Sequence, residues 1–339
     1  MVRGYHSYRG RRNPLRVLLA VLLILVILGS LALLLIQKLV VFEENGAWHL
    51  KQTEAQEEKT SEQTASAVTD EELVIEPPEE PTPTERTPQL QQTTLAALQG
   101  GAVTQAEGCN GWAFPVKDSS GMLAYDTAVE AAASSGAGGS VSREGLAQLL
   151  EEDAYYLAQF ACCHDSVYSM ANMTGAGLCQ PSGYVWFDYQ NSHWLDVSKP
   201  EARAYLASLV QELADLGFDE ILLQEFQYPV RGKLHKIDYT ALTMSREEAL
   251  CRTAQELQSA IEGTGCRLSM QVTAELLETG SQSEAGWNLS ELAGQFDRFY
   301  VETSAEQFPL LEEKLHAVNP EAELVPVGYS RADGAFLMP

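Results

Sequence analysis

An uncharged apolar run at residues 17–36 divides the chain into a short basic segment and a long acidic one. The run reads VLLAVLLILVILGSLALLLI, and Ser30 is its only polar side chain. Twenty helical residues at about 1.5 Å each span the roughly 30 Å hydrocarbon core of a bilayer. The sequence therefore predicts a transmembrane helix at 17–36 that enters the lipid bilayer, and a fully cytosolic protein is excluded.

Basic residues on one side of this run predict its orientation. Residues 1–16 carry Arg9, Arg11, Arg12 and Arg16, and basic flanks stay in the cytoplasm. We expect a cytoplasmic amino-terminal tail, an uncleaved single-pass signal anchor in the cell membrane and an extracellular carboxyl-terminal domain. A cleaved signal peptide is the alternative, although its apolar part is normally about 7–15 residues long. A buried core helix is the third interpretation.

Acidic residues dominate the rest of the chain. The protein has 47 Asp and Glu against 22 Lys and Arg, for a net charge of −25. Six of the bases lie within residues 1–42, which contain no acid, so the remainder has 22 − 6 = 16 bases against 47 acids. Such a surface repels a phosphate backbone. Nucleic-acid binding is therefore excluded.

Residues 43–93 have the composition of a disordered stalk. They are rich in Glu, Gln, Thr and Pro, and the run at 76–83 (EPPEEPTP) shows no apolar periodicity. A segment of this kind buries too little surface to offset the entropy lost on ordering, and its prolines and carboxylates keep it extended. The folded domain is therefore expected at 94–339.

The six cysteines all follow the anchor, in a compartment that permits disulfides. Six cysteines allow 15 pairings, so bridges and buried free thiols both remain open. The adjacent pair in Cys162-Cys163-His164-Asp165 lacks the CxxC spacing that grips zinc, and no metal site is expected. The sequence also lacks GxSxG, GxxxxGK and GxGxxG motifs, so no serine triad and no nucleotide cofactor is expected. His164 and His193 are interpreted as structural loop histidines.

Helix and strand patterns alternate through the folded region. Ser198 and Ser245 open helices with capping-box patterns, and Gly217 and Gly263 end them. Strands are expected at 112–116, 155–161, 218–223, 268–272, 298–301 and 324–327. Such alternation predicts right-handed crossovers and a parallel sheet, and the length fits a (β/α) barrel of the TIM type. Because only six of the eight strands are identified, an incomplete barrel is the alternative.

Three motifs resemble those of a known family. They are FPVKDSSG at 114–121, WLDV at 194–197, and LGFDEILLQEFQYP at 216–229. These are similar to D-V-K-D-D-S-G, W-L-D-P and L-G-F-D-E-I-Q-F-D-Y-V-R-F-P of the putative glycoside hydrolase domain of bacterial membrane-anchored or secreted proteins, a relative of amylase-type barrels. The resemblance covers about residues 110–335. It implies a barrel and carbohydrate as the ligand class.

The chain departs from this family at its acidic positions. Gln224 and Gln271 replace two Asp residues, Gln227 replaces an Arg, and Pro115 replaces an acid. An amide cannot exchange a proton as a carboxyl group does, and glycoside hydrolysis normally needs two carboxyl groups. The replacement favours a sugar-binding domain with weakened or lost catalysis, in which Gln224, Gln227, Tyr228 and Gln271 contact the sugar.

Four carboxylates remain as catalytic candidates because they follow predicted strands, where barrel chemistry takes place. They are Asp118, Glu225, Glu275 and Glu302. Strand alternation turns Glu225 away if Gln224 faces the barrel mouth, unless a bulge reverses it. The alternative is that each is a solvated loop charge. Lys117 and Asp118 are either site residues or a buried ion pair, whereas Asp219 and Glu220 precede a strand and are expected to be structural.

Aromatic residues crowd the long connection at 162–198. Flat rings stack on the apolar faces of sugars while polar neighbours bind the hydroxyls. We therefore expect Trp186, Asp188, Tyr189 and Trp194 to bind substrate, the alternative being a loop that packs its own small core. The function predicted is contact with polysaccharide. An active glycosidase with a relocated carboxylate pair and a non-catalytic protein-binding scaffold of the cell envelope are the alternatives.

Overall fold

The computed structural model describes residues 88–101, 103–242, 244–328 and 336–338, together with the backbone of 40–42 and 48–50. The predicted basic tail, the apolar run at 17–36 and most of the predicted stalk lie outside these residues. Within them, no helix is both long and apolar enough to cross a membrane. The chain forms two compact units, Met1–Glu79 and Glu80–Pro339. In the first, β1 (Val40–Phe42) pairs antiparallel with β2 (Trp48–Leu50).

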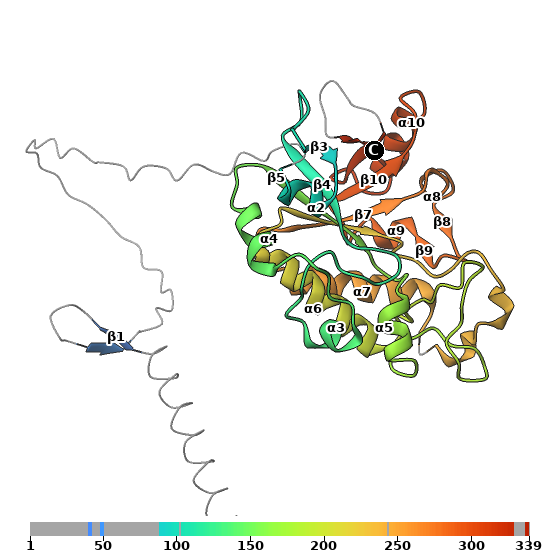
Figure 1. The fold of residues 1–339 in the computed structure, drawn as a ribbon. Coiled ribbons are helices and arrows are strands. Elements are labelled where there is room, and N and C mark those ends of the chain that lie inside the picture. The colour runs from blue at the N-terminus through green and yellow to red at the C-terminus, as the bar shows by residue number, and fades with distance from the viewer. Residues whose placement is uncertain are drawn as a thin grey trace, which may run out of the picture. The chain divides into compact units, whose positions relative to one another are not determined.

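The second unit is a barrel of eight parallel strands (Figure 1). Each strand pairs with the next barrel strand along the chain, and the last pairs with the first through Leu337 and Leu90, which closes the sheet. The predicted α/β barrel is confirmed. The strands are β3 (Gln89–Gln92), β4 (Gly111–Lys117), β5 (Tyr155–Ala161), β6 (Glu220–Gln224), β7 (Arg267–Val272), β10 (Arg298–Glu302), β11 (Glu323–Val327) and β12 (Phe336–Met338).

Two of these strands differ from the sequence expectation. All six predicted strands are present, but β3 and β12 were not predicted. Because β3 lies within the segment expected to be a stalk, the barrel begins before the predicted boundary at residue 94. Its sequence, QLQQ, carries a single apolar residue, Leu90, which is fully buried. Backbone pairing with both neighbours, rather than an apolar pattern, makes this segment a strand.

Helices of very different lengths connect the strands. The two longest, α6 and α7, lie side by side (Figure 1). Ser245 accepts a hydrogen bond from Glu248 N as predicted, whereas α6 begins one residue later than its predicted cap, with Pro200 in the first turn. The helices are α2 (Leu95–Gln99), α3 (Glu130–Ser135), α4 (Arg143–Leu150), α5 (Ser166–Ala171), α6 (Pro200–Leu216), α7 (Arg246–Ala260), α8 (Ala274–Thr279), α9 (Leu289–Leu292) and α10 (Phe308–His316), with short 3₁₀ turns η1 (Leu234–Lys236) and η2 (Tyr239–Ala241).

The buried side chains form two cores. A large core joins the outer face of the sheet to the helices and includes Phe114, Phe160, Leu209 and Phe299. A small one joins residues from different strands around the barrel, such as Leu90, Leu157, Leu222, Tyr300 and Val325. These residues come from strands on different sides of the closed barrel and contact one another. They therefore fill the barrel interior, as in other barrels of this type.

A buried polar network lies at the amino-terminal ends of the strands. Arg298 Nη1 lies 2.5 Å from Glu220 Oε2, and Arg298 Nε donates to Glu323 at 2.7 Å. Burial lowers the pKa of Arg298, but Glu220 together with Tyr300, Tyr155 and Glu323 outweighs burial and raises that pKa above its usual value. Asp219 accepts a hydrogen bond from Tyr156 N at 2.8 Å. The structural role predicted for Asp219 and Glu220 is therefore confirmed.

Candidate functional site

Two cavities of about 660 and 460 Å³ meet at the carboxyl ends of β4 to β7. Glu225, Gln227 and Thr273 line both, so they form one hollow, which we name the cleft. Lys117, Ala161, Gln224 and Val272, the last residues of these four strands, line its smaller part. The larger part is lined by residues that include His164, Asp188, Tyr189, Gln190, Trp194, Val230, Arg231, Glu275, Ser281, Gln282 and Glu284.

Two side-chain amides line the smaller part of the cleft. Gln224 Nε2 donates to Gln271 Oε1 at 2.7 Å, and both side chains are half-buried. Gln224 ends β6 and Gln271 lies in the neighbouring strand β7. An amide pair can hydrogen-bond to sugar hydroxyls, but neither member can act as a general acid or as an ionised nucleophile.

Glu225 also reaches the cleft, although it directly follows Gln224. Regular strand alternation would place these two side chains on opposite faces. Glu225 instead has a φ of +50°, in the left-handed region, and this turns its side chain toward the same hollow. A non-glycine residue in this region is strained, and such strain clusters at functional sites. Glu225 Oε2 lies 3.0 Å from His164 Nδ1.

The His164 imidazole lies between the carboxylates of Glu225 and Asp188. Its ring stacks on Trp194 with centroids 4.4 Å apart and an interplanar angle of 9°, and its Nε2 lies 3.6 Å from Asp188 Oδ2. That Nε2 is buried without a hydrogen-bond partner. Asp188 is fixed by Trp194 Nε1 at 3.2 Å and by the backbone N–H groups of Gln190 and Ser192. The interpretation of His164 as a purely structural loop histidine missed this arrangement, because Glu225 is 61 residues away in the sequence.

The resulting carboxylate–imidazole–carboxylate line has the composition of an acid–base group. An imidazole in contact with a carboxylate can pass a proton to or from it, and the stack on Trp194 orients the ring. The Glu225 side chain is 38% exposed, so it is accessible to a ligand in the cleft, whereas His164 and Asp188 are buried behind it.

Lys117 is held in the buried ion pair that was weighed against a site role. Its Nζ lies 3.0 Å from Asp165 Oδ2 and donates to Ala161 O at 2.7 Å, with both charged side chains fully buried. Asp118, which borders the smaller part of the cleft, accepts hydrogen bonds from Ser120 N and Met122 N. Asp118 therefore shapes its own loop.

The remaining candidate residues lie at the cleft, in the protein interior or on the surface. Glu275, in the first turn of α8, lines the cleft, as do Gln227, Asp188, Tyr189 and Trp194. Trp186 and Tyr228 were expected to contact substrate, but both are buried. Trp186 Nε1 donates to Lys233 O, and burial raises the pKa of Tyr228 well above its usual value. Glu302 is exposed at the end of β10 and, as far as the structure is described, is not among the residues that line the cleft.

The long connection contains α5 and isolated antiparallel bridges such as Cys179 to Val185 and Phe187 to His193. Its buried rings, Trp186 and Trp194, belong to the large core, and other aromatic rings are exposed. Tyr184, Phe187 and Tyr189 are 71%, 46% and 64% exposed. The aromatic residues of the connection are therefore divided between the large core and the exposed surface, and no separate small core forms within this fully described segment.

The cysteines are all free thiols in the structure. Burial raises the pKa of Cys162 well above its usual value. His164 and Asp165, which follow the adjacent pair, contact Glu225 and Lys117 respectively. In the part of the chain that the structure describes, no three His, Cys, Asp or Glu side chains converge as ligands for a metal ion.

Residues 101–301 match the model of a family described as "putative glycosyl hydrolase domain". Among curated proteins, none matches the sequence.

Solved structures of other proteins are similar to parts of this chain. A hypothetical protein from Ruminiclostridium thermocellum is 20% identical with a TM-score of 0.45, covering 53% of this chain and 96% of that one. The glycoside hydrolase domain of PgaB from Bordetella bronchiseptica is 10% identical with a TM-score of 0.48, covering 75% and 94%. An exo-β-N-acetylglucosaminidase from Vibrio harveyi, in complex with N-acetylglucosamine, is 9% identical with a TM-score of 0.48. That alignment covers 71% of this chain and 41% of the enzyme.

Proposed function

The chain belongs to the putative glycosyl hydrolase domain family, and on that basis we propose that its barrel contacts polysaccharide through the cleft with weakened or lost hydrolysis. The sugar rings would lie against the exposed Tyr189, and their hydroxyls would meet the amides of Gln224 and Gln271. Pockets that combine aromatic walls with a few polar groups suit such ligands.

The observation that carries this proposal is the amide pair. Retaining and inverting glycosidases normally use two carboxyl groups across the scissile bond, about 5–5.5 Å or 6.5–9.5 Å apart. At the carboxyl ends of β6 and β7 this chain has Gln224 and Gln271, joined by a 2.7 Å hydrogen bond. The pair retains hydrogen-bonding capacity and lacks the acidity that hydrolysis needs.

We further propose that this domain is extracellular and tethered by residues 17–36. The support comes from the sequence: an uncharged run long enough for a bilayer, with five arginines before it. An extracellular location suits a domain that contacts cell-surface or exogenous polysaccharide.

A second candidate function, an active glycosidase, is favoured by the backbone of Glu225. The left-handed turn places this carboxylate in the cleft that Glu275 also lines. With His164 3.0 Å away, Glu225 could exchange a proton with the imidazole while Glu275 serves as the second carboxyl group.

Binding and turnover measured together test both candidates. The full chain, purified in detergent, is incubated with a panel of polysaccharides, and retention and release of reducing ends are recorded. The proposal predicts binding without release. Release that is lost in Glu225→Gln, but kept in the matched Glu321→Gln at an exposed position before β11, would establish the second candidate. Absence of all glycan binding, with co-purification of a protein, would contradict both and favour an envelope scaffold.

A further inference from the structure

The connection that follows β6 carries an unusual concentration of positive charge. Residues 231–236 (RGKLHK), which we name the basic loop, contain Arg231, Lys233, His235 and Lys236, all exposed. The whole chain has only 22 Lys and Arg and a net charge of −25. A cluster of this kind, on a protein so acidic, requires a reason other than solubility.

The basic loop does not stabilise the fold through its charges. Several cations elsewhere are paired, such as Arg203 with Glu256 at 2.9 Å, Arg143 with Glu212 at 3.5 Å, and Arg298 with Glu220. Within the described ranges, the basic side chains of residues 231–236 form no ion pair and no hydrogen bond. Their charges are therefore available to a ligand.

The loop is nevertheless held in a fixed position. Gly232 has a φ of +115°, and a Cβ at this position would lie 3.0 Å from the Trp186 ring. Trp186 Nε1 donates to Lys233 O at 3.1 Å, and Asp238 N donates to Cys179 O at 2.9 Å. Because its backbone is packed on the aromatic connection, the loop presents its cations with little entropy to lose on binding.

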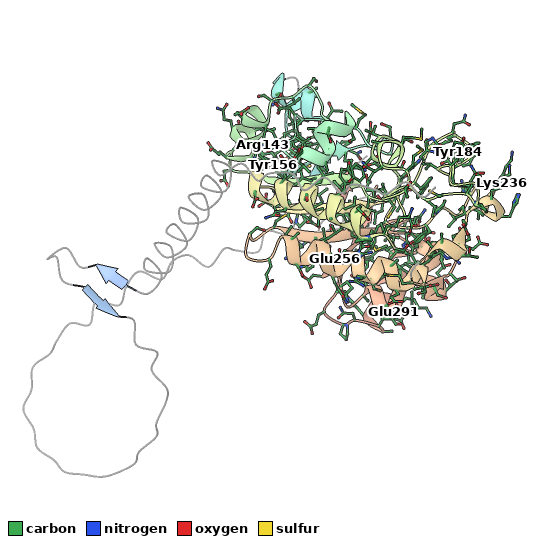
Figure 2. The ribbon with its side chains drawn as sticks, turned by 90° about the horizontal axis from the view of Figure 1, so that it is seen from below. Arg143, Tyr156, Tyr184, Lys236, Glu256 and Glu291 are labelled. Atoms are coloured by element: carbon green, nitrogen blue, oxygen red, sulfur yellow. The ribbon has the colours of Figure 1, made fainter. Side chains whose placement is uncertain are left out.

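Exposed aromatic rings lie beside these cations. Arg231 and the 64% exposed Tyr189 line the same part of the cleft. Figure 2 shows Tyr184, which is 71% exposed, and Lys236 at the same end of the domain. Rings that stack on sugars, next to guanidinium and ammonium groups that bind oxyanions, are complementary to a sugar that carries a negative charge.

We propose that the basic loop binds the anionic substituents of an acidic polysaccharide, whose sugar rings stack on the neighbouring aromatic side chains. The inference rests on the proposed contact with polysaccharide and names its chemical class: a polymer with carboxylate, sulfate or phosphate groups. Carboxylates such as Glu225, Glu275 and Glu284 line the cleft. They repel anions, so the charged substituents bind at the rim and the uncharged parts of the sugar enter the cleft.

Matched polymers and matched variants test this proposal. The full chain is titrated with polygalacturonate and with its methyl ester, which has the same backbone without the charge, and in parallel with dextran sulfate and dextran. Lys233→Gln/Lys236→Gln removes two charges from the basic loop. Arg252→Gln/Lys314→Gln removes two exposed charges from α7 and α10 and is the control.

We expect the loop variant to bind the acidic polymers about tenfold more weakly, because each exposed ion pair changes an equilibrium by a few fold. The control variant should bind them as the native chain does. Equal affinity of the loop and control variants, or equal native affinity for charged and uncharged polymers, would overturn the inference and leave the proposed function standing. Binding to no polysaccharide would contradict both. Phosphatidylglycerol vesicles bound through the same lysines, without binding of acidic polymers, would replace the glycan with a membrane surface.

Discussion

Replacing Lys117 with methionine should destabilise the barrel strongly, because it leaves a buried carboxylate without its cation. The Lys117–Asp165 pair is 3.0 Å apart and neither side chain is exposed. In Lys117→Met, Asp165 would keep only its hydrogen bonds from Tyr168 N at 2.7 Å and Tyr205 Oη at 3.1 Å. Removing one partner of a buried pair costs about 3–5 kcal/mol. Since two hydrogen bonds remain, we expect about 3 kcal/mol.

The double variant separates the ion pair from simple packing. Lys117→Met/Asp165→Asn removes both charges, while the asparagine Oδ1 can still accept a hydrogen bond from Tyr168 N and its Nδ2 can donate one to Tyr205 Oη. The loss of stability should therefore be smaller than the sum of the two single losses, with a coupling of about 2 kcal/mol.

Urea denaturation of the full chain, followed by the fluorescence of its buried tryptophans, gives these free energies. Lys314→Met, at an exposed lysine on α10, is the control and should change stability by less than about 0.5 kcal/mol. A loss below about 1 kcal/mol for Lys117→Met, or strictly additive single losses, would refute the structural role. Lys117 would then return as a binding residue.

Three further outcomes are expected. Gly121→Ala should unfold the loop after β4, because φ is +96° and the new Cβ would overlap the Asp165 carboxylate; thermal denaturation and loss of polysaccharide retention measure it. Arg298→Met should lower the free energy of unfolding in urea by about 3–5 kcal/mol, because the buried Glu220 side chain would lose its cation; a loss below about 1 kcal/mol contradicts this. Burial raises the pKa of Cys266 from 9.0 to about 12, so its stabilising contribution is present below pH 9 and is lost as the pH rises to about 12. In the native protein, the rate at which iodoacetamide alkylates Cys266 should rise with an inflection near pH 12. An inflection near pH 9 would show that the thiol is exposed.

Apolar strand patterns were sufficient to predict most of the barrel. Six strands follow from short runs of apolar residues between capped helices, since parallel strands are buried on both faces. The strands β3 and β12 could not be found in this way. QLQQ in β3 has one buried apolar residue and follows a Pro- and Glu-rich segment, and backbone pairing with β4 and β12 makes it a strand.

The site was predicted in part. Placing Gln224 and Gln271 together follows from two adjacent parallel strands ending at one edge. The orientation of Glu225 was not predictable, because alternation holds only where the backbone stays extended and a glutamate gives no signal of a φ of +50°. His164 was missed because its partners come from distant segments. Trp186 and Tyr228 have side chains suited to sugars, and only packing shows that they are buried.

Release of reducing ends by the native chain, compared with Gln224→Asp/Gln271→Asp, tests whether the amide pair replaces a catalytic pair of acids. Gln224→Asn/Gln271→Asn is the control, because it shortens both side chains equally without adding a carboxyl group. We predict no release by the native chain or the Asn variant, and hydrolysis by the variant with two Asp residues, because it restores one carboxyl group on each of two neighbouring strands to act as acid and base. Turnover by the native chain at the rate of the Asp variant would contradict this prediction.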